Sequence, residues 1–316
     1  MTRAWRFITE PDPYLSVSTR TGPSTRRPVV ILGAQGQIGF ELVRSLKLLS
    51  PVAAFARSTL DITNPDSLHA TLAPTNPLVI LNAAAYRAVD QAEEEPDIAR
   101  AANSTAPGVL AAIAEECGSC LIHYSTDYVF DGNARRPYRE SDPVSPANIY
   151  GQTKLAGEHA VMENASAAII LRTCWVYSNR GHHFLRTMQR LAGENQILRV
   201  VDDQIGCPTP AHFVAQATAE ILAGCGFSFQ RLRERRGIYH LAASGQTSWC
   251  EFARAIFRES PGLARVAIHG IKTSQYPTTA KRPAYSVLDT ARVCKEFGLS
   301  MPGWEFLLKQ TLKTHE

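Results

Sequence analysis

Short apolar runs alternate with longer stretches of helical periodicity along most of this chain. The runs hold four or five residues with almost no polar position, which is typical of strands buried on both faces. Between two of them, Ile38, Leu42, Leu46 and Leu49 recur every three or four positions and predict an amphipathic helix. The pattern predicts strands at 29–32, 52–56, 78–81, 120–124 and 168–171, and helices at 37–49, from 65 onward and at 96–117.

This alternation predicts the fold class. Buried strands separated by helices form a parallel sheet covered on both faces, so we expect an α/β protein with a doubly wound sheet. We expect residues 28–175 to form the sheet domain and residues 176–316 a smaller C-terminal lobe. Within the second part, a helix at 211–223 and a strand at 237–242 predict that residues 210–243 return to the first domain.

The first 27 residues lack this pattern. They hold five Arg against Glu10 and Asp12, and they are rich in Ser, Thr and Pro. Such a segment buries too little apolar area to offset its ordering entropy, so it is predicted to be a disordered leader. A chain shortened to begin at Arg27 should therefore fold and function like the full chain.

Composition excludes several classes of protein. The net charge of the 316 residues is +4, and the leader supplies most of it, so the near-neutral body argues against nucleic acid and membrane surfaces as partners. No apolar run approaches the roughly 18 residues of a membrane span. The seven cysteines indicate reduced thiols and a cytoplasmic location. Cys117 and Cys120 form a single CxxC pair, which is interpreted as structural rather than as a zinc site.

A glycine-rich turn joins the first strand to the first helix. Gly33 permits a tight turn, Gly36 lets the backbone approach a pyrophosphate, and Gly39 lets the helix pack closely on the strand. The helix N-terminus then offers N–H groups to phosphates. The turn therefore predicts a dinucleotide site. Its predicted contact residues are Gly33, Gln35, Gly36, Gln37, Ile38 and Gly39.

Arg57 follows the second strand, where an NAD site usually carries an acidic residue for the ribose hydroxyls. An Arg there suits the 2′-phosphate of NADPH, so NADPH is favoured, with NADH possible. The alternative is a solvated surface Arg.

Chemistry follows from three further residues. Thr126 comes directly after a predicted strand, at the sheet edge where ligands bind, and its hydroxyl can hydrogen-bond a carbonyl oxygen. Tyr150 and Lys154 share one helix face. A nearby ammonium lowers the pKa of a phenol, so Tyr150 is predicted to donate a proton to the alkoxide that forms as hydride arrives. The three residues predict the reduction of a carbonyl.

The longer motifs are more specific. They read Asn82-Ala-Ala-Ala-Tyr-Arg-Ala-Val-Asp90, Tyr124-Ser-Thr-Asp-Tyr-Val-Phe-Asp-Gly132, Asn148-Ile-Tyr-Gly-Gln-Thr-Lys-Leu-Ala-Gly-Glu158, Leu171-Arg-Thr-Cys-Trp-Val-Tyr177, Val201-Asp-Asp-Gln-Ile-Gly-Cys-Pro-Thr209 and Ala280-Lys-Arg-Pro283. From about residue 28 to the C-terminus the chain resembles the dTDP-4-dehydrorhamnose reductase family of the short-chain dehydrogenase/reductase superfamily. The resemblance implies a Rossmann-type NAD(P)-binding domain with a smaller substrate-binding lobe. It also implies NAD(P)H reduction of the C4 ketone of dTDP-4-dehydro-L-rhamnose to dTDP-L-rhamnose.

The resemblance assigns roles to individual residues. The implied catalytic residues are Thr126, Tyr150 and Lys154. Further implied cofactor contacts are Asp61, Ile62, Ala83, Ala84, Ala85, Tyr86, Arg87, Tyr124, Tyr150 and Lys154. Implied sugar-nucleotide contacts are Thr126, Asp127, Trp175, Asp203, Gln204, Gly206, Pro208, Thr209 and Arg282.

The chain departs from the family pattern at three places. Arg87 replaces a residue that is usually small and polar, and His182-His183 replace two asparagines. The N-terminal extension is also not typical of the family. Some relatives use a divalent metal at a dimer contact, and Glu41 fits that position, but one carboxylate does not establish a Mg²⁺ site. No metal ligand is therefore assigned, and the assembly is expected to be a monomer or a homodimer.

Two other functions remain open. An NAD-dependent sugar-nucleotide epimerase would use the same Tyr and Lys. A regulatory subunit of the methionine adenosyltransferase type would keep the fold without the catalysis. The motifs of the second lobe disfavour the epimerase, and the intact pair of Tyr150 and Lys154 disfavours the regulatory subunit.

Overall fold

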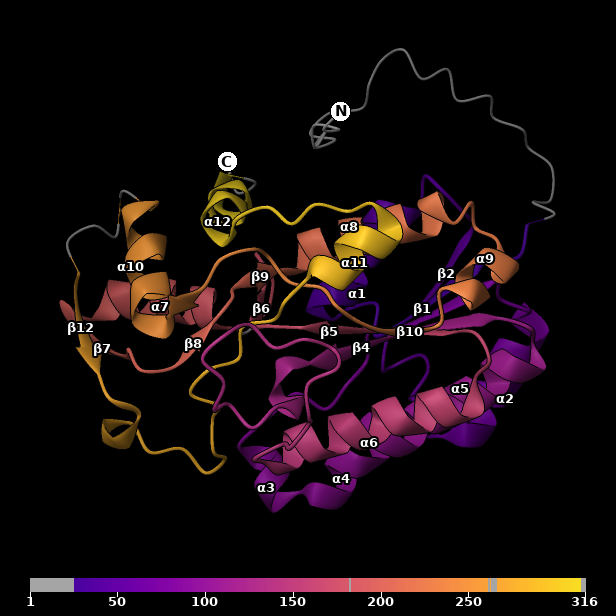
Figure 1. Ribbon diagram of the computed structural model, residues 1–316, viewed down its shortest axis with the longest axis horizontal. Helices are drawn as coiled ribbons and strands as arrows, with labels where there is room; N and C mark the ends of the chain where they lie inside the picture. Colours follow the sequence, from indigo (N-terminus) through magenta and orange to yellow (C-terminus); the bar gives the residue numbers. More distant parts are fainter. Residues whose placement is uncertain (1–25, 182, 261, 263–265, 314–316) are drawn as a thin grey trace, which may run out of the picture.

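The computed structural model describes residues 26–181, 183–260, 262 and 266–313 (Figure 1). Its centre is a six-stranded sheet in the order β10-β5-β4-β3-β1-β2, and every neighbouring pair is parallel. The strands are β1 (Val29–Leu32), β2 (Val52–Phe55), β3 (Val79–Asn82), β4 (Cys120–Thr126), β5 (Ala168–Thr173) and β10 (Gly237–His240). The chain places β2 on one side of β1 and then returns to place β3 on the other side. β1 and β3 therefore flank a topological switch point, where ligands bind in such sheets.

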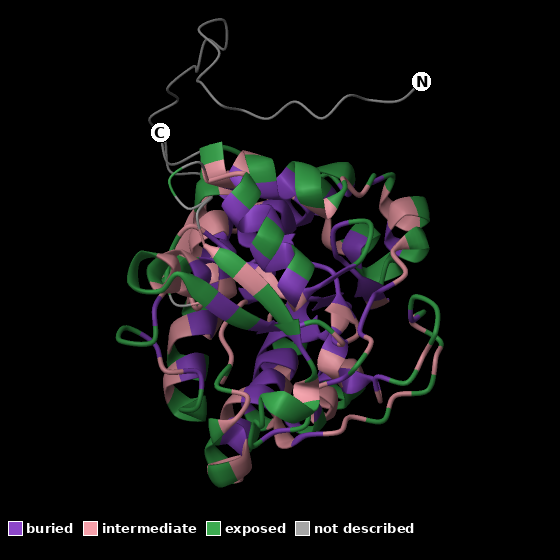
Figure 2. Ribbon diagram, turned by 90° about the vertical axis from the view of Figure 1, so that its left-hand side faces the viewer, coloured by how far each residue is buried: buried purple, intermediate pink, exposed green. Residues whose placement is uncertain are grey.

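Helices cover both faces of the sheet. One face carries α2 (Pro65–Thr75), α5 (Ala106–Glu116) and α6 (Ile149–Asn164), and the other carries α1 (Gln37–Leu46) and α8 (Ala211–Gly224) (Figure 1). Residues of β1, β3, β4 and β5 are fully or almost fully buried and divide into two apolar clusters, one toward each helical layer. Buried residues fill the inside of the fold, and exposed ones lie on the outer sides of the helices (Figure 2). The predicted doubly wound α/β fold is confirmed.

The helix expected at 96–117 has an internal interruption. It consists of α4 (Pro96–Arg100), a π-helical turn η1 (Ala101–Thr105) and α5. Pro107 has no N–H to donate to the carbonyl of Asn103, so the regular hydrogen bond between these residues cannot form. The Asn103 side chain instead holds the main chain of Tyr86 through a pair of hydrogen bonds of 2.9 and 3.0 Å. The interruption thereby fixes the loop that follows β3.

The smaller lobe is built mainly from the second half of the chain. A parallel pair of β7 (Ile197–Val201) and β12 (Ala267–Ile271) packs with α7 (Phe184–Glu194) and α10 (Trp249–Arg258) around an apolar cluster of its own. The remaining short elements of the whole chain are α3 (Gln91–Glu94), η2 (Asp127–Val129), β6 (Val176–Tyr177), β8 (Ile205–Gly206), β9 (Thr209–Pro210), α9 (Phe229–Glu234), β11 (Thr247–Ser248), η4 (Thr273–Gln275), α11 (Ala291–Phe297) and α12 (Trp304–Lys313). Although late in sequence, α8 packs on α1 and β10 is an edge strand of the main sheet.

Arg27 belongs to the folded body. The leader proposed for residues 1–27 lies outside the described residues up to position 25. The Arg27 guanidinium, however, donates hydrogen bonds to the carbonyl oxygens of Pro77 and Cys117, both at 2.6 Å, and of Gly118 at 3.0 Å. The folded region therefore begins before residue 28, because this side chain ties together the segments that enter β3 and β4.

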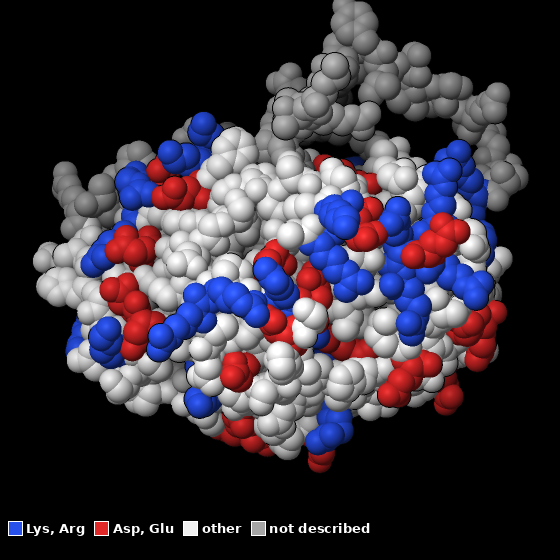
Figure 3. Space-filling view, in the orientation of Figure 1, with Lys and Arg blue, Asp and Glu red and all other residues white. Residues whose placement is uncertain are grey.

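The surface and the cysteines add two observations. Acidic and basic side chains are interspersed on the face shown in Figure 3. No helix in the described parts of the chain is long and apolar enough to cross a membrane. All seven cysteines lie in those parts and are free thiols. Cys117 is the C-cap residue of α5 and Cys120 begins β4, so the CxxC pair spans the connection from this helix to this strand.

Candidate active site

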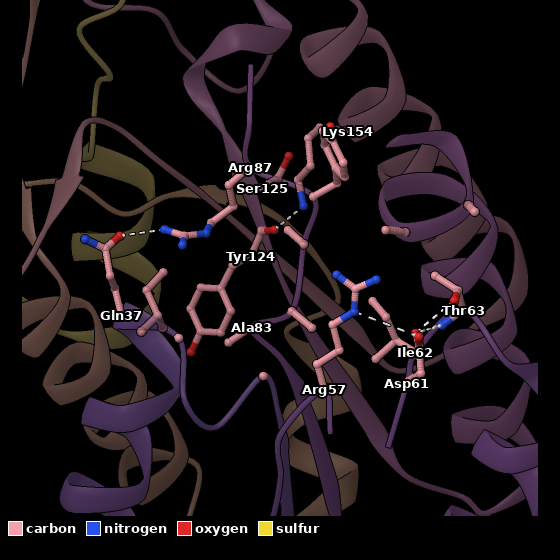
Figure 4. A pocket seen from close by; sticks show the side chains of 18 of the residues that line it. Gln37, Arg57, Asp61, Ile62, Thr63, Ala83, Arg87, Tyr124, Ser125 and Lys154 are labelled. Atoms are coloured by element: carbon pink, nitrogen blue, oxygen red, sulfur yellow. Dashed lines mark hydrogen bonds and ion pairs between the residues drawn. The ribbon is translucent and has the colours of Figure 1, made fainter. Parts of the chain in front are cut away.

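A groove of about 610 Å³ lies at the carboxyl ends of the sheet strands (Figure 4). Its walls come from the glycine-rich turn, the loops after β2 and β3, the end of β4 and the first turns of α6. Most of the residues predicted to bind a cofactor line it. They are Gly33, Gln35, Gly36, Gln37, Ile38, Arg57, Asp61, Ile62, Ala83, Ala84, Ala85, Tyr86, Arg87, Tyr124, Tyr150 and Lys154.

The glycine-rich turn has the shape that a diphosphate needs. Gly33 has a φ of +76°, and a Cβ there would lie 2.8 Å from the backbone nitrogen of Ala84. A Cβ on Gly39 would lie 2.1 Å from the carbonyl oxygen of Gly33, so Gly39 serves close packing and does not line the groove. No side chain caps the N-terminus of α1 at Gly36, and its first turn carries no acidic residue. Its free N–H groups are therefore available to an anion.

Tyr150 and Lys154 reach the groove from α6. Asn148 begins this helix because its side-chain oxygen accepts a hydrogen bond from Gly151 N at 2.8 Å. Lys154 Nζ donates to the carbonyl oxygen of Tyr124 at 2.6 Å and lies 3.1 Å from His123 Nε2. Burial lowers the pKa of Lys154 to about 8, since the charged form loses its hydration.

The predicted tuning of Tyr150 by Lys154 is wrong for this state of the protein. Burial raises the pKa of Tyr150 to about 12, a hydrogen bond with Thr126 and the charge of Arg87 lower it, and Asp127 raises it. The ammonium of Lys154 is directed at β4, as Figure 4 shows, rather than at the phenol. The sequence spacing brings the two residues to one helix face but does not fix the direction of the lysine side chain.

Two hydroxyls in the groove lack partners. Ser125 Oγ on β4 and Thr173 Oγ1 on β5 have no hydrogen bond within the described residues, although Ser125 is only 5% exposed and Thr173 only 7%. Both residues line the groove. A buried hydroxyl without a partner costs free energy, so these two positions fit a polar ligand. The sequence analysis did not assign either residue. Their position at the carboxyl ends of neighbouring strands was the available signal.

The two arginines of the groove differ in their contacts. Arg57 lies at the rim with 87% of its side chain exposed, 3.9 Å from the carboxylate of Asp61. Arg87 Nη1 donates to Gln37 Oε1 at 3.2 Å, so its side chain extends from the loop after β3 toward the first turn of α1 (Figure 4). Both guanidiniums are therefore available to the phosphates of a ligand in the groove.

The side chains of three residues that were predicted to contact a ligand bond to other protein groups instead. The hydroxyl of Tyr124 is 2.8 Å from Thr218 Oγ1 on α8, so only the main chain of Tyr124 faces the groove. The buried carboxylate of Asp127 accepts hydrogen bonds from Thr126 Oγ1 at 3.1 Å and Cys174 Sγ at 3.3 Å, and burial raises its pKa to about 6. Thr126 itself is 6% exposed and lies outside the groove lining.

Trp175 is packed closely by two neighbours. Its indole stacks on Trp249 with a centroid separation of 3.5 Å. A Cβ added to Gly206 would lie 2.4 Å from the indole, so only glycine fits there. Trp175 also has a φ of +45°, an uncommon conformation for a residue with a side chain. The ring face that stacks on Trp249 is therefore closed to a ligand unless the indole moves. Trp249 was missed in the sequence because it lies 74 positions away.

The other predicted sugar-nucleotide residues are spread over the small lobe. Asp203 and Gln204 hold Thr273 through hydrogen bonds of 2.7 and 3.1 Å. Pro208 and Thr209 are buried, and Thr209 Oγ1 bonds to the main chain of Cys207 and Ala243, so neither side chain is available to a ligand. Arg282 is paired with Asp90 at 2.6 Å.

Three residues that were singled out in the sequence remain without an assigned role. His182 lies outside the described residues, and His183 is the N-cap residue of α7. Glu41 is paired with Arg44 at 3.2 Å. Within the described ranges, no three His, Cys, Asp or Glu side chains are grouped as a metal site would need.

Comparison with known proteins identifies the family. The model of the RmlD substrate binding domain matches residues 27–316. A dTDP-4-dehydrorhamnose reductase from Burkholderia thailandensis is 44% identical over 290 residues, which cover 88% of this chain and 95% of the relative. The dTDP-4-dehydrorhamnose reductase of Escherichia coli K12 is 40% identical over 292 residues, covering 90% of this chain and 96% of that protein.

Solved structures agree. A dTDP-4-dehydrorhamnose reductase from Clostridium acetobutylicum superposes with a TM-score of 0.85 at 34% identity, covering 91% of this chain and 99% of the other. The Bacillus anthracis enzyme of the same name, solved in complex with NADP, gives a TM-score of 0.84 at 33% identity, covering 92% and 99%. The resemblance drawn from the motifs is thus confirmed, and this chain belongs to the dTDP-4-dehydrorhamnose reductase family.

Proposed function

We propose that this protein uses NADPH to reduce the C4 ketone of dTDP-4-dehydro-L-rhamnose, giving dTDP-L-rhamnose. The observation that carries the proposal is the placement of Tyr150 and Lys154 in the same groove as the uncapped glycine-rich turn. This arrangement puts a proton donor beside a dinucleotide site. The relatives named for this reaction, and the NADP complex of one of them, support the substrate and the cofactor.

The residues of the groove fit a dinucleotide from end to end. The turn at Gly33 and Gly36, with the first N–H groups of α1, would bind the diphosphate. Asp61 and Ile62 would contact the adenosine, where the exposed Arg57 is free to pair with a 2′-phosphate. Lys154 would donate to the nicotinamide ribose. The partnerless hydroxyls of Ser125 and Thr173 suit the polar groups at the nicotinamide end.

The chemistry is divided between the cofactor and the chain. When bound, NADPH supplies the hydride that forms the new C–H bond at C4 of the sugar. Tyr150 then gives its phenolic proton to the C4 oxygen, and solvent restores that proton. Thr126 is hydrogen-bonded to Tyr150 and holds the phenol in place, and it would polarise the carbonyl once its hydroxyl proton turns from Asp127 to the substrate. The charge of Arg87, which lowers the pKa of Tyr150, helps to offset the effect of burial.

On the substrate side, we assign the dTDP portion to the small lobe and to Arg282. Arg282 is only 17% exposed and already faces a carboxylate, so its guanidinium is oriented rather than free to rotate. The edge of Trp175 and the neighbouring Gly206 are assigned to the sugar. The free thiols are consistent with action in the cytoplasm, which is also proposed.

The test is a direct assay that separates the three candidate functions. Purified protein is mixed with NADPH and dTDP-4-dehydro-L-rhamnose, NADPH absorbance is followed, and the product is identified. The proposal expects NADPH consumption equal to the dTDP-L-rhamnose formed. An epimerase would change the sugar without net consumption of NADPH, and a regulatory subunit would consume none.

A further inference from the structure

Residues 280–283, here called the strap, connect the small lobe to the active site. The N–H of Ala280 donates to Asp90 Oδ1 at 3.0 Å, and Arg282 Nη2 pairs with Asp90 Oδ2 at 2.6 Å. A Cβ on Gly132 would lie 2.6 Å from Pro283, so the strap runs directly against the sheet domain. Both oxygens of one carboxylate therefore hold the strap.

Asn148 holds the strap from the other side. Its Nδ2 donates to the carbonyl oxygen of Lys281 at 2.8 Å, while its Oδ1 accepts from Gly151 N at 2.8 Å. The side chain is 3% exposed. A single buried amide thus joins the strap to the first turn of α6, the turn that carries Tyr150.

The short helix α3 completes this connection. Asp90, which holds the strap, directly precedes α3, and Glu93 lies one turn later. Glu93 Oε1 accepts from Ile149 N at 2.8 Å, so it satisfies the first free N–H of α6. One turn of chain therefore binds the strap at one end and the catalytic helix at the other.

Resting on the proposed function, we infer that Asp90, Glu93 and Asn148 are positioning residues that couple sugar-nucleotide binding at the strap to the placement of Tyr150. The strap carries Lys281 and Arg282, the two cations next to these contacts, and a nucleoside diphosphate is the anion they would bind. Tyr150 is the second residue of α6, so a shift of the first turn moves its hydroxyl directly. A correctly seated diphosphate then places the proton donor.

The sharpest variant is Asn148→Asp. It keeps the side-chain oxygen that caps α6, but it replaces the donor to Lys281 with an oxygen that repels the carbonyl. The chain offers a matched control in Asn64→Asp. Asn64 caps α2 by accepting from Ser67 N at 3.0 Å and contacts no part of the strap. The melting temperatures of both variants should lie within a few degrees of that of the wild type.

For Asn148→Asp we expect kcat for the sugar nucleotide to fall by roughly tenfold or more, because a buried hydrogen bond is replaced by a repulsion. Saturating substrate should not restore it, whereas Arg282→Ala should act mainly on KM. The Kd of NADPH should stay within about twofold of the wild type. The variant Asp90→Asn removes the charge that orients Arg282, and it should likewise lower kcat while leaving the Kd of NADPH nearly unchanged. It replaces Asn148→Asp in this experiment if Asn148→Asp does not fold.

Two results would overturn the inference. Kinetics of Asn148→Asp equal to those of Asn64→Asp would show that the bond to Lys281 carries no coupling. Equal losses in kcat and in NADPH affinity would show general damage to the fold. If the wild type itself leaves the sugar nucleotide unreduced, the proposed function fails instead, and the strap is then tested by dTDP binding. Arg282→Ala should lower that affinity about tenfold, and an unchanged affinity would exclude the strap as its site.

Discussion

Tyr150 and Lys154 lie four residues apart on α6, yet each side chain has its own partners. The lysine is held by the main chain of Tyr124 and by His123, and the phenol is hydrogen-bonded to Thr126. In the absence of cofactor, burial raises the pKa of Tyr150 and lowers that of Lys154. No direct interaction between these two side chains offsets either shift.

The role of Tyr150 is tested by Tyr150→Phe. This change keeps the ring and its edge-to-face contact with Tyr128 but removes the proton donor. We expect kcat to fall by roughly 10²–10⁴, the usual contribution of a general acid, with NADPH affinity nearly unchanged. Steady-state kinetics and a fluorescence titration with NADPH measure the two quantities. Turnover close to that of the wild type would remove Tyr150 from its assigned role.

The lowered pKa of Lys154 predicts that cofactor binding depends on pH. Its pKa of about 8 means that the free protein loses the ammonium proton above that pH. The phosphates and ribose of a bound dinucleotide favour the charged form, so binding must then take up a proton. The Kd of NADPH should be constant below about pH 8 and rise about tenfold per pH unit above it. Lys154→Met should bind weakly at every pH. A wild-type Kd that stays flat to pH 9.5 would contradict this prediction.

Among individual site residues, those that belong to continuous motifs could be predicted from the sequence. Gly33 and Gly36 of the glycine-rich turn line one groove together with Tyr150 and Lys154. Ser125 and Thr173 were missed because nothing in a sequence distinguishes a partnerless buried hydroxyl from a satisfied one. Thr209 was assigned to a ligand through its motif, but its hydroxyl bonds to the main chain of the interior.

At the scale of elements, α6 is the part that places the chemistry, and a buried ion pair fixes it to the sheet. Arg172 on β5 donates two hydrogen bonds to Glu158 on α6, at 2.9 and 2.6 Å, with both side chains almost fully buried. The guanidinium also lies 5.2 Å from the centre of the Phe130 ring. The pair therefore holds the turn after Lys154 against the strand that carries Thr173.

Glu158→Gln should destabilise the fold by about 3–5 kcal/mol, because it leaves the charge of Arg172 buried and unpaired. Glu158→Leu combined with Arg172→Met removes both charges and should recover most of that loss. Urea unfolding of the wild type, the single variant and the double variant measures the difference. A single variant within about 1 kcal/mol of the wild type would show that water already reaches the pair.

Element type could largely be read from apolar periodicity, whereas local deviations could not. The strands of the sheet lie close to their predicted positions because buried parallel strands leave a continuous apolar run. The π-helical turn at Ala101–Thr105 was missed because its cause is the absence of one N–H at Pro107 within an otherwise regular apolar pattern. The motif of the strap was singled out in the sequence, but its contacts were missed because they join positions more than 130 residues apart.

For the whole molecule, Arg27 already belongs to the folded region, two residues before the first strand. Its guanidinium bonds to carbonyl groups in the segments that enter β3 and β4. Composition alone placed this arginine with the leader, because a charged residue before an apolar run gives no sign of where its side chain will bond.

Arg27→Ala should lower the free energy of unfolding by roughly 1–3 kcal/mol, since it leaves several partly buried carbonyl groups without donors. A chain shortened to begin at Arg26, with Arg27 retained, should match the full chain in melting temperature and NADPH affinity. Thermal unfolding of the four proteins, long and short with either residue, separates the two effects. If shortening costs as much as the substitution, residues before Arg26 also contribute to the fold.

In the proposed reaction, hydride passes from NADPH to C4 of the sugar nucleotide in the groove that Tyr150 and Lys154 share with the glycine-rich turn. The most direct measurement uses NADPH with deuterium at both C4 positions and dTDP-4-dehydro-L-rhamnose in single turnover, followed by mass and NMR analysis of the product. We expect dTDP-L-rhamnose with one deuterium, bonded to C4, and a much slower transfer in Tyr150→Phe. A product without deuterium, or with deuterium at another carbon, would contradict it.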